Sequence, residues 1–127
     1  MTLFNFTLQR GAPIPDQVLF AAIRAILRGE FQPGQAFPSV RAIAADLKIH
    51  PNTAHKVIQA LIEEGWLETR AGVGTTVASG PRTQSADWRR LLRDDVDRLI
   101  VKARSNDLAL SQVNDELAAR WEKFGAG

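Results

Sequence analysis

The sequence predicts a mainly α-helical protein with one small β-hairpin. Apolar residues recur at helical spacing in five segments, which is the pattern of amphipathic helices. Two short segments that favour strands flank a Gly-containing stretch at residues 71–74, as in a hairpin. A polar Gly/Pro/Ser stretch at residues 79–87 separates the last two helical segments from the rest. We therefore expect a first domain over residues 1–80 and a helical tail over residues 81–127.

Composition limits the classes of protein to consider. Of 127 residues, 45% are apolar and 24% charged, which is typical of a globular chain. There is no cysteine, which excludes disulfides and thiolate metal sites and suits a reducing compartment. No apolar run has membrane-spanning length, and the N-terminus lacks the pattern of a signal peptide, so we expect a soluble, cytoplasmic protein without a membrane partner.

The charge is balanced in both parts of the chain. Residues 1–80 hold seven basic and six acidic side chains, and residues 81–127 hold nine and eight. Neither part is a basic tail, so binding to nucleic acid would depend on a few well-placed groups.

The first elements in order are a strand and a helix. Residues 2–9 alternate apolar and polar side chains, which predicts a short strand with one buried face. Pro15 suits the first turn of a helix that we expect to end at Gly29. The apolar residues of this helix spread too widely for one core, so Phe20 and Leu27 are expected to cover a second surface.

The next elements are two helices separated by a short break. Ser39, which follows Pro38, is expected to open a second helix over residues 39–47. A break at residues 48–50 leads into a third helix over residues 51–64, and Gly65 is expected to end it in a left-handed conformation.

This order of elements has the form of a winged helix-turn-helix. The start of the third helix carries polar hydrogen-bonding groups, and a helix start also offers free N–H groups to an anion. In such motifs the first helix of the pair braces the second, whose N-terminal turn faces base edges in the major groove. The following hairpin would be the wing. The predicted fold is therefore a winged helix-turn-helix followed by a C-terminal helical hairpin.

The two tail helices carry more apolar surface than two isolated helices can bury. We expect Trp88 and Trp121 in the core of the hairpin and Trp66 in the core at the base of the wing. The expected dimerisation residues are Trp88, Leu92, Val96, Leu99, Ile100, Val113, Leu117, Trp121 and Phe124.

The motifs of the first domain resemble those of a known family. "GEFQPGQAFPSVR", "PNT", "EEGWLE" and "GVGTTV" follow one another within residues 13–77 in the order and spacing of the GntR family of bacterial transcription regulators. The short helical tail resembles the YtrA-type subfamily, in which two C-terminal helices mediate dimerisation. The remaining length is too short for the larger effector domains of other subfamilies.

The resemblance implies DNA contacts in three places: the start of the second helix, the start of the third and the wing. The implied DNA-binding residues are Ser39, Arg41, Pro51, Asn52, Thr53, His55, Lys56, Arg70, Gly72, Gly74 and Thr75. The wing glycines suit this function because a side chain there would hold the backbone away from phosphate.

Three positions depart from the family pattern. Lys48 stands where glycine is usual, so it is expected to adopt a left-handed conformation at a cost of about 1 kcal/mol. His50 stands where serine or asparagine usually caps the recognition helix, and imidazole is expected to be a poorer cap. Val73 replaces a usual arginine between the wing glycines, which would remove a DNA contact.

Alternatives remain open at single residues. The polar helix start could be a solvated cap, and Arg41 could pair with Asp46. His50 and His55 could bind a metal, but no third ligand lies near them in sequence. The acidic residues within 93–98 do not share a helical face, which favours a solvated face with local ion pairs over a metal site.

We interpret the chain as a sequence-specific transcriptional regulator, with repression expected from the resemblance, that binds an inverted repeat in double-stranded DNA as a homodimer. No catalytic motif, cofactor motif or metal-ligand spacing is present, so we do not expect an enzyme. The alternative is a winged helix that only contacts protein, which would predict a neutral or apolar recognition face. No residue set identifies a small-molecule effector, although one could bind between tail and first domain.

Overall fold

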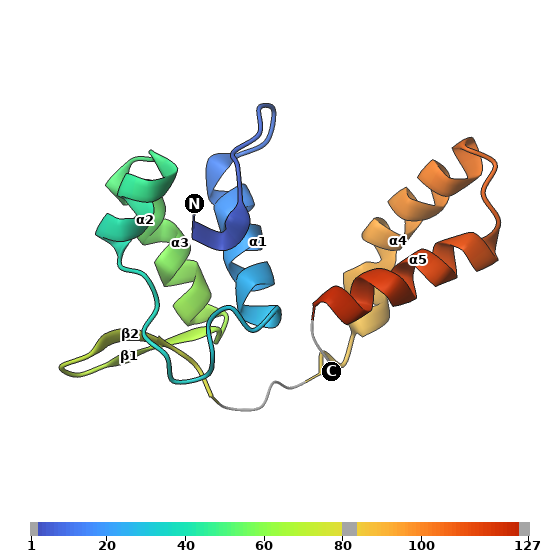
Figure 1. The fold of residues 1–127 in the computed structure, drawn as a ribbon. Helices are drawn as coiled ribbons and strands as arrows, with labels where there is room; N and C mark the ends of the chain where they lie inside the picture. The colour runs from blue at the N-terminus through green and yellow to red at the C-terminus, as the bar shows by residue number, and fades with distance from the viewer. Residues whose placement is uncertain (1–2, 80–83, 125–127) are drawn as a thin grey trace. The chain divides into compact units, whose positions relative to one another are not determined.

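The computed structural model describes residues 3–79 and 84–124, and it confirms the mainly α-helical prediction. The chain divides into two compact units, residues 1–79 and 80–127, each described by itself below. The elements, labelled in Figure 1, are a 3-10 turn η1 (Leu3–Asn5), helices α1 (Ile14–Leu27), α2 (Val40–Leu47) and α3 (Pro51–Glu63), strands β1 (Leu67–Arg70) and β2 (Gly74–Val77), and helices α4 (Trp88–Ser105) and α5 (Leu110–Lys123). Part of the expected linker, residues 80–83, lies outside the described residues.

Helix α3 packs against both α1 and α2 and so forms the centre of the first unit. Three alanines of α1, Ala21, Ala22 and Ala25, are fully buried, and their small side chains allow the helices to approach closely. On the other side of α1, Phe20 is 60% exposed and Leu27 44% exposed. The expectation that these two residues lie off the core is confirmed.

The predicted N-terminal strand is wrong. Residues Leu3–Asn5 form a 3-10 turn instead, in which Phe4 has a left-handed φ of 64° and is only 3% exposed. The Phe4 ring lies 5.7 Å from the ring of Phe37 and 5.9 Å from that of Phe31. The alternating pattern therefore reflects an anchored aromatic turn, and the Leu3 amide bonds the Asp46 carboxylate at 2.6 Å rather than a neighbouring strand.

The predicted hairpin is confirmed. Strands β1 and β2 are antiparallel, with Leu67 opposite Val77 and Arg70 opposite Gly74. A third segment that the sequence did not predict runs along the free edge of β2. The Phe37 amide donates to the Thr75 carbonyl at 2.9 Å, and the Gly34 amide donates to the Val77 carbonyl at 2.8 Å. These bonds tie the loop before α2 to the wing.

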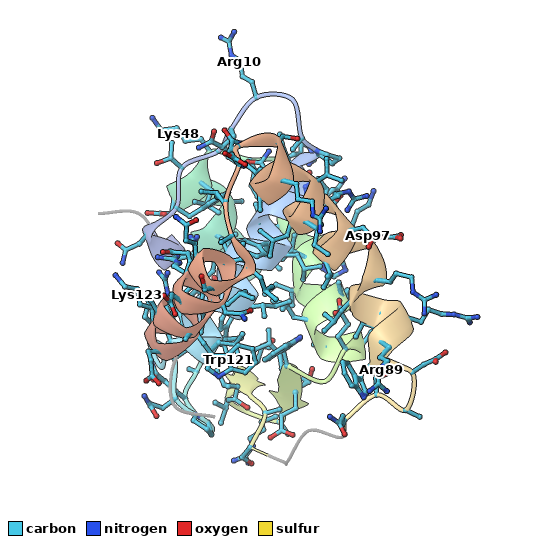
Figure 2. The ribbon with its side chains drawn as sticks, turned by 90° about the vertical axis from the view of Figure 1, so that its right-hand side faces the viewer. Arg10, Lys48, Arg89, Asp97, Trp121 and Lys123 are labelled. Carbon is cyan, nitrogen blue, oxygen red and sulfur yellow. The ribbon has the colours of Figure 1, made fainter. Side chains whose placement is uncertain are left out.

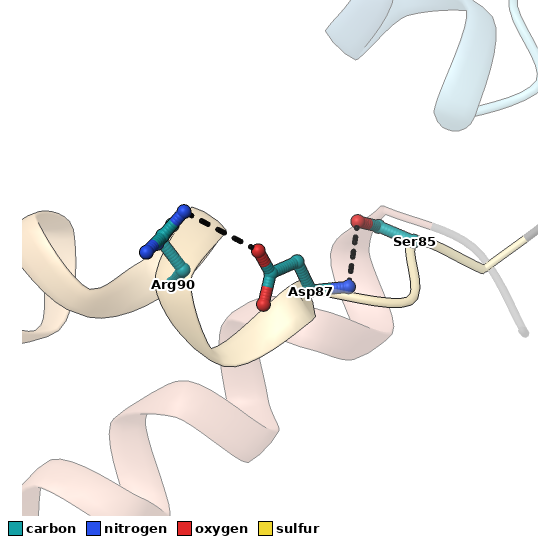
Figure 3. A network of polar contacts seen from close by, with 3 residues as sticks. All are labelled: Ser85, Asp87 and Arg90. Atoms are coloured by element: carbon teal, nitrogen blue, oxygen red, sulfur yellow. Dashed lines mark hydrogen bonds and ion pairs between the residues drawn. The ribbon is translucent and has the colours of Figure 1, made fainter.

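Helix α4 begins with local polar contacts, drawn in Figure 3. The Asp87 amide donates to Ser85 Oγ at 3.3 Å, and the Asp87 carboxylate lies 3.6 Å from the Arg90 guanidinium. At the far end of α4 the Leu108 amide donates to the Ala103 carbonyl at 3.0 Å, and Gln112 Oε1 accepts from the Ala109 amide at 2.8 Å. These bonds fix the turn between α4 and α5.

The α4–α5 hairpin has almost no core of its own. Among residues 84–124, Ala103 near the turn is the one buried side chain. Trp88 is 41% exposed and Trp121 65% exposed, so the expectation that they form the hairpin core is wrong for the single chain. Two helices that meet near their connecting turn do not enclose enough volume to bury large aromatic rings.

Candidate DNA-binding surface

The α2–α3 pair is held by three local features of the backbone. At the start of α2, Ser39 Oγ accepts a hydrogen bond from the Ala42 amide at 3.1 Å. At its end Lys48 adopts the left-handed conformation, with φ 56° and ψ 48°, and the Ile49 amide returns to the Ala44 carbonyl at 3.1 Å. The predictions for Ser39 and for Lys48 are confirmed. Figure 2 shows Lys48 at the periphery, where its side chain is exposed.

His50 caps helix α3. Its Nδ1 atom accepts a hydrogen bond from the Asn52 amide at 3.0 Å, as a serine or asparagine oxygen would. Because Nδ1 accepts, the neutral imidazole carries its hydrogen on Nε2. The structure thus shows that His50 caps α3, while the expectation that imidazole caps less strongly than serine or asparagine stays a prediction.

The first two turns of α3 separate core and surface cleanly. Ala54 and Val57 are buried, while Asn52, His55 and Lys56 are exposed. Pro51 is also exposed, and Thr53 is half-buried with its amide bonded to the His50 carbonyl at 3.0 Å. Four of the predicted reading positions therefore face outward: Pro51, Asn52, His55 and Lys56.

The exposed charged side chains around the break between α2 and α3 are all basic. Arg41, Lys48 and Lys56 are exposed, and within the described residues none of them forms an ion pair. The alternative pairing of Arg41 with Asp46 is wrong, because the half-buried Asp46 carboxylate bonds the Leu3 amide instead. The cations are thus left available to an anionic partner.

The wing ends in a tight turn between Arg70 and Gly74. Gly72 and Gly74 have φ values of 77° and 99°, a conformation that L side chains rarely adopt. Open space surrounds both glycines, so backbone conformation rather than lack of room explains their occurrence. Val73 is 61% exposed at the tip, where the family usually has a cation.

The other two candidate DNA contacts of the wing, Arg70 and Thr75, differ in how available they are to a partner. Arg70 lies 3.6 Å from Glu68, and both side chains are about half-exposed, so solvent screens this pair. Thr75 is half-buried, and its carbonyl is used by the Phe37 amide. Arg70 is therefore the better placed of the two to meet a phosphate.

The acidic residues of α4 form a solvated face, as predicted. Arg98 lies 3.4 Å from Asp95, both well exposed, and Figure 2 shows Asp97 projecting away from the helix. In the described part of the chain no three His, Cys, Asp or Glu side chains come together as a metal site would require. No helix within the described ranges combines the length and apolarity needed to cross a membrane.

Comparison with known proteins identifies the first unit. The family described as "Bacterial regulatory proteins, gntR family" matches residues 16–77, which run from the first turn of α1 to the end of β2. The chain carries a GntR-family DNA-binding domain. The GntR regulators are transcriptional regulators rather than enzymes, in agreement with the lack of a catalytic motif.

The similarity to GntR-family proteins extends beyond residues 16–77. The chain is 28% identical over 104 residues to the HTH-type transcriptional repressor YtrA of Bacillus subtilis (strain 168), which covers 81% of this chain and 80% of that one. The solved structure of YtrA from Sulfolobus acidocaldarius, a GntR-family transcription factor, superposes with a TM-score of 0.61 at 27% identity, covering 79% of this chain and 99% of that one.

A second solved structure that matches this chain contains an operator. The DNA-binding domain of AraR, solved in complex with operator ORX1, matches with a TM-score of 0.51 at 28% identity, covering 61% of this chain and 95% of that one. The matches agree with the predicted GntR resemblance and with its YtrA-like character.

Proposed function

We propose that this chain is a sequence-specific transcriptional regulator that binds double-stranded operator DNA as a homodimer. One observation carries the proposal: the start of α3 is capped, outward-facing and flanked by unpaired cations. Asn52, His55 and Lys56 are exposed there, opposite the buried Ala54 and Val57. A rigid helix start with donors and positive charge matches what a major groove requires of a reading helix.

The proposed contacts with DNA are of two chemical kinds. Arg41, Lys56 and Arg70 are charged and mainly supply affinity through phosphate contacts, which are independent of sequence. Asn52 and Thr53 contribute to the choice of sequence, because a side-chain amide can pair with adenine and a hydroxyl with several base edges. The exposed Arg70–Glu68 pair is weak, so Arg70 can exchange it for a phosphate.

The homodimer is proposed from the apolar surface of the tail. Leu92, Val96, Leu99, Ile100 and Leu117 are exposed in addition to the two tryptophans. A surface of this kind is unusual for a monomer and is typical of an interface. A second copy of the hairpin offers a matching apolar surface, and twofold symmetry would present two reading helices to an inverted repeat.

Repression is the direction of regulation that we propose. The related YtrA of Bacillus subtilis is named a repressor, and a dimer bound near a promoter can occlude polymerase without further machinery.

The test is fluorescence-anisotropy binding of the full chain to its own upstream region and to scrambled DNA across a salt series. Arg41→Ala and Asn52→Ala are measured in parallel. Loss of a good base contact should weaken binding by about 1–3 kcal/mol, whereas loss of a phosphate contact should weaken all sequences alike and flatten the salt dependence.

Arg98→Ala is the matched control, because it removes the same charge from an exposed ion pair of α4 outside the candidate surface. Equal and weak binding to every sequence, unchanged by Arg41→Ala and Asn52→Ala, would instead favour the winged helix as a protein-interaction module.

A further inference from the structure

A largely apolar groove opens within the candidate DNA-binding surface. It has a volume of about 670 Å³ and lies between α2, the break and the start of α3. Its lining residues are Val40, Arg41, Ala44, Ala45, Ile49 and Pro51. Arg41 is the one charged member of this set.

The groove is formed by particular residues of this chain. Ala45 is exposed on α2 and, being small, leaves the recess open. Ile49 in the break is half-buried, with part of its side chain packed against the core. Pro51 occupies the first position of α3, where its ring is exposed and its lack of an N–H has no consequence for the helix.

The surroundings of the groove fit DNA as its occupant. Arg41 lines it, while Lys48 and Lys56 are exposed on the neighbouring break and helix. The nearby carboxylate of Asp46 is half-buried and bonded to the Leu3 amide at 2.6 Å, so it contributes little negative surface. The groove is also continuous with the exposed reading residues of α3, since Pro51 directly precedes Asn52.

Within a major groove, the apolar group that a base edge offers is the C5 methyl of thymine. Burying such a group in an apolar recess is favourable, whereas cytosine carries only a hydrogen at C5 and leaves the recess unfilled. The recess therefore discriminates between pyrimidines without a hydrogen bond.

We propose that this groove seats the C5 methyl of one thymine in each operator half-site, with Pro51, Ile49 and Ala45 as specificity-determining residues. The inference rests on the proposed function. It adds to the hydrogen-bonding residues a second, apolar mode of reading, and it predicts a thymine beside the base that Asn52 contacts.

The experiment removes the methyl from the DNA and leaves the protein unchanged. Duplexes bound by the full chain are selected from a random library, and each thymine of the selected half-site is replaced in turn by deoxyuridine. We expect one position per half-site at which the loss of the methyl weakens binding about fourfold, the value of one buried methyl-sized group. Other thymines should tolerate the replacement.

Two protein variants locate the effect. Pro51→Ala removes most of the exposed ring, so the ratio of the dissociation constants for the uracil and thymine duplexes should fall towards one. Lys56→Ala should weaken both duplexes equally and preserve the ratio, because a phosphate contact does not sense the methyl. Circular dichroism of both variants checks that the helices are retained.

The outcomes separate this inference from the proposed function. A selected operator that shows no uracil effect at any thymine, or an effect that survives Pro51→Ala, overturns the methyl site and leaves the regulator intact. Failure to select any sequence over random DNA overturns both.

Discussion

At the scale of single residues, two unusual side chains shape the reading helix. Lys48 accepts a left-handed conformation in the break, and His50 caps α3 through Nδ1. Both residues depart from the pattern that the GntR resemblance implies at their positions. Their observed roles are conformational, so their contributions should appear first in stability.

His50→Ala should lower the free energy of unfolding by about 1 kcal/mol, because the Asn52 amide loses its acceptor. His50→Asn supplies another acceptor, so its free energy of unfolding should remain close to that of the parent protein. Urea unfolding measures the difference in free energy between the variants. The protein concentration is kept the same throughout, because the stability of a dimer depends on it. Equal stability of the alanine and asparagine variants would contradict the capping role.

Lys48→Gly should raise the free energy of unfolding by about 0.5 kcal/mol. Glycine adopts positive φ without strain, although it also makes the unfolded chain more flexible, which offsets part of the gain. Lys48→Ala is the matched control, since it removes the same charge but keeps a Cβ atom. In thermal and urea unfolding, Lys48→Gly should be more stable than Lys48→Ala. The reverse order would show that the left-handed residue carries no strain.

At the scale of elements, the N-terminal turn and the wing are both tied to the segments around α2. Phe4 stacks on Phe37, whose own amide bonds β2 at Thr75. The Leu3 amide bonds Asp46 of α2. The aromatic turn therefore holds together parts of the first unit that are distant in sequence.

Phe4→Ala should destabilise the first unit by about 3 kcal/mol, the lower part of the range for removing a buried aromatic side chain. Val73→Ala, at the exposed tip of the wing, is the matched control and should change stability little. Urea unfolding monitored by tryptophan fluorescence compares the two. A small effect of Phe4→Ala would mean that the turn is dispensable for the fold.

At the scale of the whole molecule, the two units differ in how completely they bury their apolar residues. Residues 1–79 enclose a core from α1, α2, α3 and the wing. In the tail, by contrast, apolar side chains along α4 and α5 remain exposed. We infer that the first unit folds by itself, whereas the tail acquires its core by association.

A chain truncated at Gly80 should be a folded monomer, while the full chain should be a dimer in size-exclusion chromatography with light scattering. In the full chain, Leu117→Glu should weaken the dimer because it places a charge on the apolar surface. Glu116→Ala, its neighbour in sequence, is the control. A truncated chain that remains dimeric would remove the tail from the interface.

The sequence predicted the helices well because their signals are local. Ser39 stands directly before α2, and Gly65 after α3 has the expected left-handed conformation, with φ 82°. The N-terminal segment was predicted wrongly because alternation of Phe4, Phe6 and Leu8 is compatible with any segment that buries part of its side chains. Its pairing with Asp46 is a long-range contact without a local signature.

The sequence by itself determined the order of elements, the family and the outward position of the α3 start, since periodicity, caps and motif spacing are encoded in neighbouring residues. Only the tertiary structure decided two further features: the attachment of residues 34–37 to β2 and the apolar groove between Ala45 and Pro51. Each of these joins atoms whose separation depends on how helices and loops pack. Local sequence patterns do not fix such distances, which is the physical reason why they became visible only in the folded chain.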